Sequence, residues 1–377
     1  MNAIAIIGGG ITGTAAADAL AREGHSVTLI EKSGIAAMAS GRTLGGVRQS
    51  GRHPAELPLA QAAVELWGGL ADVLGTDVDY RRSGNLRLAR TPAEIEIVRD
   101  LVHAQRAQGL DLVFLPDNAA VRAVAPALSN RVLAASYCAT DGHADPVKAT
   151  NAFAQSARRH GATIREGVRA LAIQIVNDRV AGVLTAAGSI PAERVIVAAG
   201  VDTPALLAPL GLHLPLSMQV VSVVQSEPLP PTLDQVFGVA NADCAGRQEV
   251  GGRLRFTDGG SSEPAWTNEP SANAVRAVVE RVANVLPVAG AATVSRTWTG
   301  LVDLTPDALP VIDMPARVAG LIVAAGFSGH GFCLGPVSGL LCADLAVGRT
   351  PRHDVAAFQL ARFERGPLAA TSPTLHG

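Results

Sequence analysis

The sequence predicts an α/β fold made of a discontinuous Rossmann-like nucleotide-binding domain and a substrate domain built on a mixed, largely antiparallel sheet. Three observations predict it. Residues 1–31 run through strand, glycine turn, helix and strand, and buried-strand segments that end in glycine recur at 195–199 and 320–325. A chain of 377 residues also exceeds one ordinary core. Segments this far apart can share one parallel sheet only if the nucleotide-binding domain is discontinuous.

The first element is a strand over residues 3–7, because its residues are apolar and mostly β-branched. A glycine turn follows at 8–13, and the Ala-rich residues 14–22 are helix-prone. A second strand at 27–30 ends in Glu31. This order of elements is the one that a dinucleotide site requires.

Each part of this turn has a physical reason. Gly8 permits the tight turn, Gly10 lets the backbone approach a pyrophosphate, and Gly13 lets the helix pack closely on the strand. The helix N-terminus favours the negative charge of a diphosphate. Glu31 can accept hydrogen bonds from ribose hydroxyls and would repel the 2′-phosphate of NADP. The alternative is an ordinary glycine turn without a nucleotide.

The next part of the chain alternates loop, helix and strand. Residues 33–51 are rich in Gly, Ala and Ser and predict an ordered loop, and residues 54–74 form an amphipathic helix. A strand is expected at 79–89. The sequence Thr-Pro-Ala-Glu begins a helix at 91–108, and 111–143 contain short strands and turns.

The remaining elements are predicted from apolar patterns bounded by Gly, Pro, Asn and Asp. In chain order they are a helix at 145–160, a hairpin at 163–185 that turns at 177–178, a strand at 194–199, sheet strands within 216–257, a helix at 271–285, strands at 295–304 and 320–325, a glycine turn at 326–331 and a helix at 335–347.

The identity of the cofactor is inferred from the absence of further βαβ units directly after Glu31. An NAD dehydrogenase usually completes its nucleotide domain in one continuous block of βαβ units, and no such block follows here. FAD is therefore favoured over NAD. The predicted boundaries are 1–54, 144–214 and 318–366 for the FAD-binding domain, 55–143 and 215–317 for the substrate domain, and 367–377 for a C-terminal tail.

Composition restricts the partners and the compartment. The net charge is −2 without any Lys/Arg tract, so no nucleic-acid partner is expected. Four scattered cysteines without a C-x-x-C pair predict reduced thiols, no metal site and a cytoplasmic protein. No apolar run reaches the roughly 18–20 residues of a membrane span, and the N-terminus does not resemble a signal peptide.

Several motifs together carry a family resemblance. They are the turn 6–13 with Glu31, the strand 195–200 ending in Ala-Gly, the run 298–310 and the loop 325–332. This pattern resembles the D-amino-acid oxidase-like family of FAD-dependent oxidoreductases of the glycine and sarcosine oxidase type. The last loop resembles most the β subunits of heteromeric sarcosine oxidase, opine oxidase and (hydroxy)proline dehydrogenase.

The resemblance implies oxidation of an amino acid or secondary amine of the sarcosine, proline, hydroxyproline or opine kind, by hydride transfer from Cα to flavin. It also implies possible partner subunits of a heteromeric complex. The residues it assigns to the cofactor are Gly8, Gly10, Ile11, Thr12, Gly13, Glu31, Lys32, Ser40, Arg42, Thr43, Val168, Ala199, Gly200, Gly326, Ser328, Gly329, His330, Gly331 and Phe332.

Three residues are predicted to be catalytic. Arg48 and Arg52 are candidates to bind a substrate carboxylate, since a guanidinium fork matches a carboxylate. The alternative places them on the surface or beside the pyrophosphate. His330 is expected to contact the flavin; the alternative is a loop histidine bonded to backbone. His143 is expected to be structural.

Two positions depart from the family pattern. Val302 stands where glycine oxidase-like proteins have Arg, which argues against a glycine oxidase-like site. Cys333 stands where monomeric sarcosine oxidases have a Lys tied to oxygen use, which favours the dehydrogenase-like β subunits. Cys333 could attach flavin covalently, but a small buried side chain is the favoured interpretation.

Other functions remain open at this point. The chain could be an NAD-dependent dehydrogenase that uses the same fingerprint, or a flavin-holding subunit of a larger complex without turnover of its own. It could also be an FAD-dependent 2-hydroxy acid dehydrogenase of similar shape.

Overall fold

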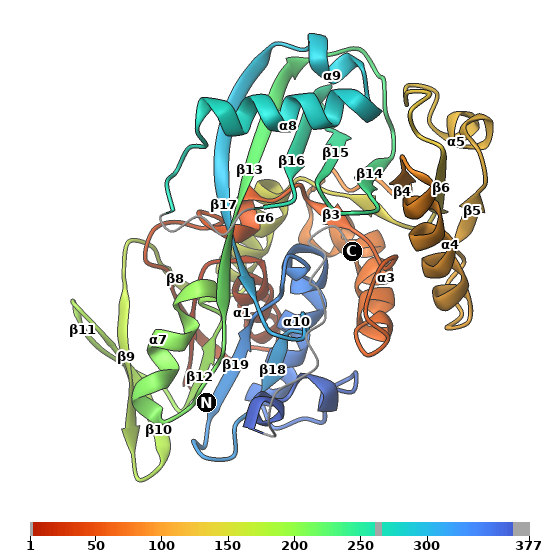
Figure 1. Cartoon of the computed structure of the whole chain (residues 1–377). Coiled ribbons are helices and arrows are strands. Elements are labelled where there is room, and N and C mark those ends of the chain that lie inside the picture. The colour runs from red at the N-terminus through yellow and green to blue at the C-terminus, as the bar shows by residue number, and fades with distance from the viewer. Residues whose placement is uncertain (1–2, 261–265, 365–377) are drawn as a thin grey trace.

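The computed structural model describes residues 3–260 and 266–364. Two large sheets dominate it: a six-stranded sheet in the lower part of Figure 1 and an eight-stranded sheet in the upper part. The six-stranded sheet has the order β18 (Val311–Asp313), β19 (Leu321–Ala325), β12 (Arg194–Val197), β1 (Ala3–Ile7), β2 (Ser26–Ile30) and β8 (Thr163–Arg165).

The six-stranded sheet confirms the predicted discontinuity. Strand β1 lies between β2 and β12 and is parallel to both, and β12 pairs in parallel with β19. Strands from the start, middle and end of the chain therefore lie side by side. The edge strand β18 is antiparallel to β19.

Helices cover one face of this sheet and a small sheet covers the other. On the first face Ile6, Ile196 and Ile322 share a core with α1 (Ile11–Arg22), α3 (Leu57–Leu74), α6 (Pro146–Arg159) and α10 (Gly331–Ala346). Alternate residues such as Val195 and Val197 face α7 (Thr203–Leu207) and the sheet formed by β9 (Ala170–Val176), β10 (Arg179–Thr185) and β11 (Gly188–Pro191). This alternation is the two-residue period of a strand.

The second large sheet is antiparallel except where β14 pairs with β4. The helix α8 (Ala272–Val285) packs on it through Val278, Val282 and Val285 (Figure 1). The strands of this eight-stranded sheet, in spatial order, are β17 (Val294–Leu304), β13 (Ser217–Pro228), β16 (Arg253–Asp258), β15 (Cys244–Gln248), β14 (Val236–Val239), β4 (Asn85–Ala89), β6 (Ala134–Cys138) and β5 (Val113–Leu115).

The smaller elements complete the chain. The segment expected as a loop contains the short helix α2 and the strand β3, which pairs with β7. The bounds are α2 (Ala39–Arg42), α4 (Pro92–Arg106), α5 (Asn118–Val124), α9 (Val288–Ala291), β3 (Gly46–Val47), β7 (Gly142–His143), and 3₁₀ turns at Gly200–Asp202, Ala208–Leu210, Ala356–Phe358 and Leu360–Glu364.

Local predictions hold where side-chain chemistry decides them. Asn177 and Asp178 both have positive φ, 52° and 57°, as a tight hairpin turn requires. The last helix begins four residues earlier than predicted, at Gly331, because the run of positive φ ends at Gly329 and His330 already has α-like backbone angles. Pro336 therefore lies inside α10.

The predicted domain boundaries stay predictions. Strand β18, which falls in the part assigned to the substrate domain, pairs in the six-stranded sheet. The predicted tail at 367–377 lies outside the described residues. No helix in the described ranges has the length and apolar character needed to cross a bilayer.

Candidate active site

A long cleft in two parts lies where the two large sheets meet. The first part, called the glycine half, is lined by Gly8, Gly9, Glu31, Lys32, Val168 and Ala199, among others. The second, called the arginine half, is lined by Arg48, Arg52, Asn85 and strand side chains of the eight-stranded sheet. Both halves share Gly10, Ala39, Ser40, Ala198, Gly200, Leu301 and Asp303.

Close backbone packing builds the glycine half. Gly8 has φ +117°, and a Cβ there would lie 2.2 Å from the carbonyl oxygen of Ala198. A Cβ at Gly13 would lie 2.1 Å from the carbonyl oxygen of Gly8. Both positions therefore exclude any side chain. The result is that β1, α1 and β12 converge at the mouth of the turn.

Glu31 stands at the end of β2 with its carboxylate against the turn. Its Oε2 accepts a hydrogen bond from Gly9 N at 2.7 Å, and its Oε1 accepts one from Ser33 N at 2.7 Å. A carboxylate has about four acceptor sites, so capacity for further donors remains. The neighbouring Lys32 forms an ion pair with Asp202.

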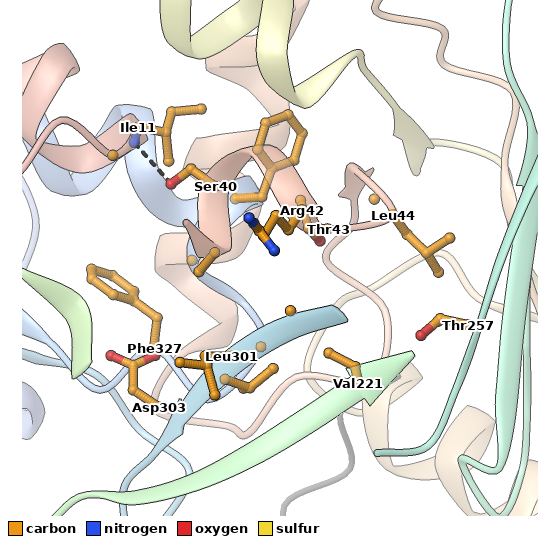
Figure 2. Close-up of a pocket in the computed structure, with 18 of the residues that line it drawn as sticks. Ile11, Ser40, Arg42, Thr43, Leu44, Val221, Thr257, Leu301, Asp303 and Phe327 are labelled. Carbon is orange, nitrogen blue, oxygen red and sulfur yellow. Dashed lines mark hydrogen bonds between the residues drawn. The ribbon is translucent and has the colours of Figure 1, made fainter. Parts of the chain in front are cut away.

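The short helix α2 closes one side of the cleft (Figure 2). Ser40 Oγ accepts a hydrogen bond from Ile11 N at 3.0 Å, which ties α2 to the first turn of α1. Arg42 donates to the carbonyl oxygens of Ala37 and Thr299. Its guanidinium therefore anchors α2 to β17.

The C-terminal glycine turn is held by β17. Asp303 accepts a hydrogen bond from Gly326 N at 2.8 Å, and its carbonyl oxygen accepts one from Ser328 N at 2.9 Å. Thr305 N donates to Ser328 Oγ at 3.2 Å. These bonds hold Ser328 in the left-handed region at φ 51°. Burial raises the pKa of Asp303 to about 6.

The two glycine turns meet, as the sequence predicts. Helix α10 packs so closely on α1 that a Cβ at Gly335 would lie 2.3 Å from Ile11 Cγ2, and a Cβ at Gly339 would lie 2.6 Å from Ala15 Cβ. This packing brings Gly329, Gly331 and Phe332 into the same cleft as Gly10, Ile11 and Thr12.

The arginine half has a buried group of charges at its base. Arg52 lies 3.7 Å from Glu56, measured from Nε to Oε1. His330 Nδ1 lies 3.0 Å from Glu56 Oε1. Burial and the nearby Arg52 lower the pKa of His330 to about 4, so the ring is neutral at pH 7. Its Nδ1–H therefore donates to an ionised Glu56.

Arg48 Nη1 donates to the carbonyl oxygen of Ser50 at 3.1 Å, and Ser50 belongs to a chain of buried polar side chains. Asn85 donates to Ser50 Oγ at 3.2 Å, and the Ser50 hydroxyl donates to Asp141. The backbone N–H of Gln49 also donates to Asp141, at 2.8 Å. Burial, together with Arg52, lowers the pKa of Arg48 well below its ordinary value. An anion beside Arg48 would relieve this cost.

The opposite wall of the arginine half is apolar. Strands β13, β14 and β15 contribute Val221, Val223, Val236, Phe237 and Ala245. Figure 2 shows Val221 on this side, across from the helix that carries Arg42. The cleft therefore has positively charged side chains at its bottom and an apolar wall opposite them.

Most of the predicted site residues line this cleft. Four do not: Gly13, Gly326, Ser328 and His330. Those that do are Gly8, Gly10, Ile11, Thr12, Glu31, Lys32, Ser40, Arg42, Thr43, Arg48, Arg52, Val168, Ala199, Gly200, Gly329, Gly331 and Phe332.

Sequence reasoning missed Asn85, Asp303, Phe327 and Glu56. The first three line the cleft, and Glu56 lies buried behind Arg52. For Asp303 a signal existed, because it lies two residues before the Thr-Pro-Asp sequence, inside the run 298–310 that carries part of the family resemblance.

Two other singled-out residues lie outside the cleft lining. His143 is buried with Nδ1 3.0 Å from Arg247 Nη1, and burial beside Arg247 lowers its pKa to about 2, which fits a structural histidine. The buried thiol of Cys333 donates to the carbonyl oxygen of Arg48 at 3.4 Å. Burial raises the pKa of Cys333 to about 11.

The comparison with protein families decides the identity. The model of the family described as FAD dependent oxidoreductase matches residues 3–345. The chain belongs to this family. It is therefore an oxidoreductase that uses FAD.

Individual relatives agree with this assignment. Glycine oxidase of Geobacillus kaustophilus is 31% identical, over 95% of this chain and 96% of that protein. Sarcosine oxidase subunit beta of Rhizobium meliloti is 28% identical, over 99% and 92%. The solved structure of L-proline dehydrogenase from P. horikoshii has a TM-score of 0.90 at 28% identity, over 98% of this chain and 99% of that one.

One relative is much longer than this chain. The 4-methylaminobutanoate oxidase (formaldehyde-forming) of Paenarthrobacter nicotinovorans is 28% identical over 95% of this chain, which spans 45% of that protein.

The residues present fit FAD. The cleft is continuous from Glu31 to Arg52, as a long dinucleotide requires, and its middle is the turn around Gly10, where backbone replaces side chains. The helix α1 points its N-terminus at this middle, which suits a diphosphate. The C-terminal turn and the N-terminus of α10 offer further N–H donors beside the arginine half.

Proposed function

We propose that this protein oxidises an amino acid or secondary amine of the sarcosine, proline, hydroxyproline or opine kind to the imine. The observation that carries the proposal is the pair Arg48 and Arg52 at one end of the cofactor cleft, opposite an apolar wall. The carboxylate of an amino-acid substrate would bind to the two arginines, and its compact carbon skeleton would pack against the apolar wall.

The two arginines bind and orient the substrate. Arg52 is 5% exposed, and its Nη1 is buried without a hydrogen-bond partner among the described residues. Arg48 is 8% exposed and lines the same wall. A buried guanidinium binds a carboxylate strongly because little water competes for its donors.

The apolar wall favours the neutral form of the substrate amine. Burial disfavours a charged ammonium, so side chains such as Val223 and Phe237 lower the cost of losing its proton. Neutral His330 donates through Nδ1 to Glu56, so we assign it a positioning role at the end of the loop. No general base of the chain is required once the amine is neutral.

Bound FAD would supply the acceptor for the hydride that leaves the substrate Cα, and the neutral amine would become an iminium ion, the protonated form of the imine. The chain positions the groups around this step. We propose that the residues of the glycine half hold the adenosine and diphosphate, and that Gly329, Gly331 and Phe332 lie against the flavin ring.

We also propose that the chain works within a heteromeric complex. The likeness to a sarcosine oxidase subunit beta supports this, and so does Cys333 in place of the lysine tied to oxygen use. Turnover with an artificial electron acceptor but little turnover with oxygen is expected. Fast oxygen consumption by the isolated chain would contradict the role of a partner.

The decisive experiment is an anaerobic screen of flavin bleaching on the purified protein. Sarcosine, D- and L-proline, hydroxyproline, opines, common D-amino acids and 2-hydroxy acids are added separately, and absorbance at about 450 nm, which belongs to oxidised flavin, is followed. At least one amine is expected to bleach the flavin. Bleaching by 2-hydroxy acids alone would replace the proposal with the hydroxy acid dehydrogenase.

A further inference from the structure

We propose that Gln105, near the end of α4, is a positioning residue that holds Arg52 in the orientation that binds the substrate carboxylate. This inference rests on the proposed function and deepens it, because it identifies what fixes the arginine. Gln105 is 3% exposed and does not line the cleft. It therefore acts on the substrate only through residues 50–53, the segment called here the arginine turn.

The side-chain amide of Gln105 bonds to the main chain on both sides of this turn. Gly51 N donates to Gln105 Oε1 at 2.9 Å, and Gln105 Nε2 donates to the carbonyl oxygen of Arg52 at 3.1 Å. A glutamine amide has both an acceptor and donors, so one side chain can satisfy both backbone groups. Within the described ranges, neither backbone group has another hydrogen-bond partner. Gln105 therefore links the main chain around Arg52 to α4.

The arginine turn has no regular secondary structure of its own. It lies between β3 and α3, outside any helix or strand, and Gly51 has φ +72° in the left-handed region. No ladder of backbone hydrogen bonds can fix such a segment. Because buried backbone groups need partners, side chains from elsewhere must supply them, and here Gln105 does.

Gln105 is itself held firmly. The N–H of Leu110 donates to the carbonyl oxygen of Gln105 at 3.1 Å, and Gly109 between them has φ +84°, which is the usual C-terminal turn of a helix. A small apolar cluster packs this end of α4 against the start of α3. The buried members of the cluster are Leu57, Val102, Leu110, Leu112 and Cys138. The amide therefore projects from a fixed support.

The side chain of Arg52 has separate restraints. Its Nε and Nη2 both donate to the carbonyl oxygen of Arg48 at 3.3 Å, and its Nε lies 3.7 Å from Glu56 Oε1. These contacts leave Nη1 as the buried nitrogen without a partner in the described part of the chain. A guanidinium points correctly only if its main chain is also in place. A displacement of about 1 Å at a binding group can cost up to roughly 100-fold.

The test uses pyrrole-2-carboxylate, titrated into the flavin-loaded oxidised protein and followed by the change in flavin absorbance. This anion has the ring size and carboxylate of proline, but the carbon that bears its carboxylate has no hydrogen to lose. Gln105→Met keeps the length of the side chain without the amide, and it should raise the dissociation constant roughly tenfold or more. Gln105→Glu keeps an acceptor for Gly51 N, so a smaller rise is expected.

The kinetic readout separates binding from chemistry. With the best amine of the screen, Gln105→Met should raise KM by a similar factor and change kcat much less. This split is expected because Arg52 holds the carboxylate equally in the bound substrate and during hydride transfer. Flavin content per chain should stay at the wild-type level, since Gln105 lies outside the lining of both halves of the cleft.

A matched control is available in the eight-stranded sheet. Gln248 is also buried, at 7% exposed, and also holds a loop through both ends of its amide. Its Oε1 accepts from Thr232 N at 2.8 Å, and its Nε2 donates to the carbonyl oxygen of Pro230 at 2.9 Å, away from the cleft lining. Gln248→Met should lower the midpoint of thermal unfolding about as much as Gln105→Met, yet leave the dissociation constant and KM unchanged.

Three results would overturn the proposal. They are unchanged affinity in flavin-loaded Gln105→Met, an equal loss of affinity in Gln248→Met, and no binding of the anion to the wild-type protein. If Gln105→Met does not fold, Gln105→Glu decides, and wild-type affinity in that variant contradicts the role of Gln105.

The anion titration requires no turnover, so it stays separate from the amine screen. Weakened binding in Gln105→Met without oxidation of any amine would remove the proposed function and keep the role of Gln105. Amine oxidation with unchanged affinity in Gln105→Met would do the reverse.

Discussion

Backbone groups shape one half of the cleft, and buried charged side chains shape the other. In the glycine half, backbone groups and missing side chains shape the surface, and a single carboxylate, Glu31, is bonded to the turn itself. In the arginine half, buried charged side chains face apolar strands. The first half has the close backbone approach that suits a diphosphate, and the second has the charged and apolar side chains that suit a small acid.

This difference has an energetic counterpart. Backbone packing at Gly8 tolerates no added atom, whereas a buried charge can be changed without filling space. Substitutions in the glycine half should therefore act on folding and on FAD. Substitutions in the arginine half should act on substrate affinity and on pH dependence.

The largest effect is expected for Gly8→Ala. The new Cβ would meet the Ala198 carbonyl oxygen at 2.2 Å, and φ is +117°, so the turn cannot keep its shape. Loss of FAD-loaded protein is expected, measured as flavin per chain after purification. The control Gly24→Ala also has positive φ but meets nothing within 4 Å, and it should retain FAD. Normal FAD content in Gly8→Ala would contradict the packing argument.

The next effect concerns Arg52. Arg52→Met should raise KM for a carboxylate substrate roughly 100-fold, because it removes a buried charged partner. Arg52→Lys retains the charge without the fork, so a smaller rise is expected. Steady-state kinetics with the best amine from the screen measure both. If neither Arg52→Met nor Arg48→Met alters KM, the two arginines do not bind the carboxylate.

The third effect is acid sensitivity from His330. Its pKa is about 4 in the folded protein against about 6.5 unfolded, so the unfolded chain binds the extra proton in between. Stability therefore falls as pH falls, by about 2 kcal/mol between pH 7 and pH 5 from this group. Urea unfolding at both pH values should show a smaller loss in His330→Gln.

The exposed His103 provides the control for this measurement. His103→Gln should show the full wild-type loss of stability at pH 5. Equal losses in all three proteins would mean that His330 is protonated in the folded state.

The smallest effect is expected for Glu31→Ala. Without its carboxylate the turn loses the bond to Gly9 N and any bond to ribose, so FAD affinity should fall roughly tenfold. Fluorescence titration of the FAD-free protein measures this. Glu166→Ala is the control, since Glu166 accepts from Ile35 N in the same loop but does not line the cleft. Unchanged affinity would remove Glu31 from the cofactor site.

The sequence by itself determined the fold class and the glycine half. The turn at 8–13, its strands and Glu31 are close in the chain, so spacing alone describes their geometry. The buried strands at 195–199 and 320–325 could be predicted from the sequence because parallel strands are apolar throughout. Their place in one parallel sheet with β1 followed from that pattern.

Only the tertiary structure decided the arginine half. Glu56, Asn85, Asp141 and His330 come from four separate segments, and they interact with the arginines and with one another only because the fold buries them together. Spacing cannot reveal which charges become neighbours, nor that Asp303 holds the C-terminal turn. Electrostatic energies depend on distance and burial, and both are properties of the folded chain.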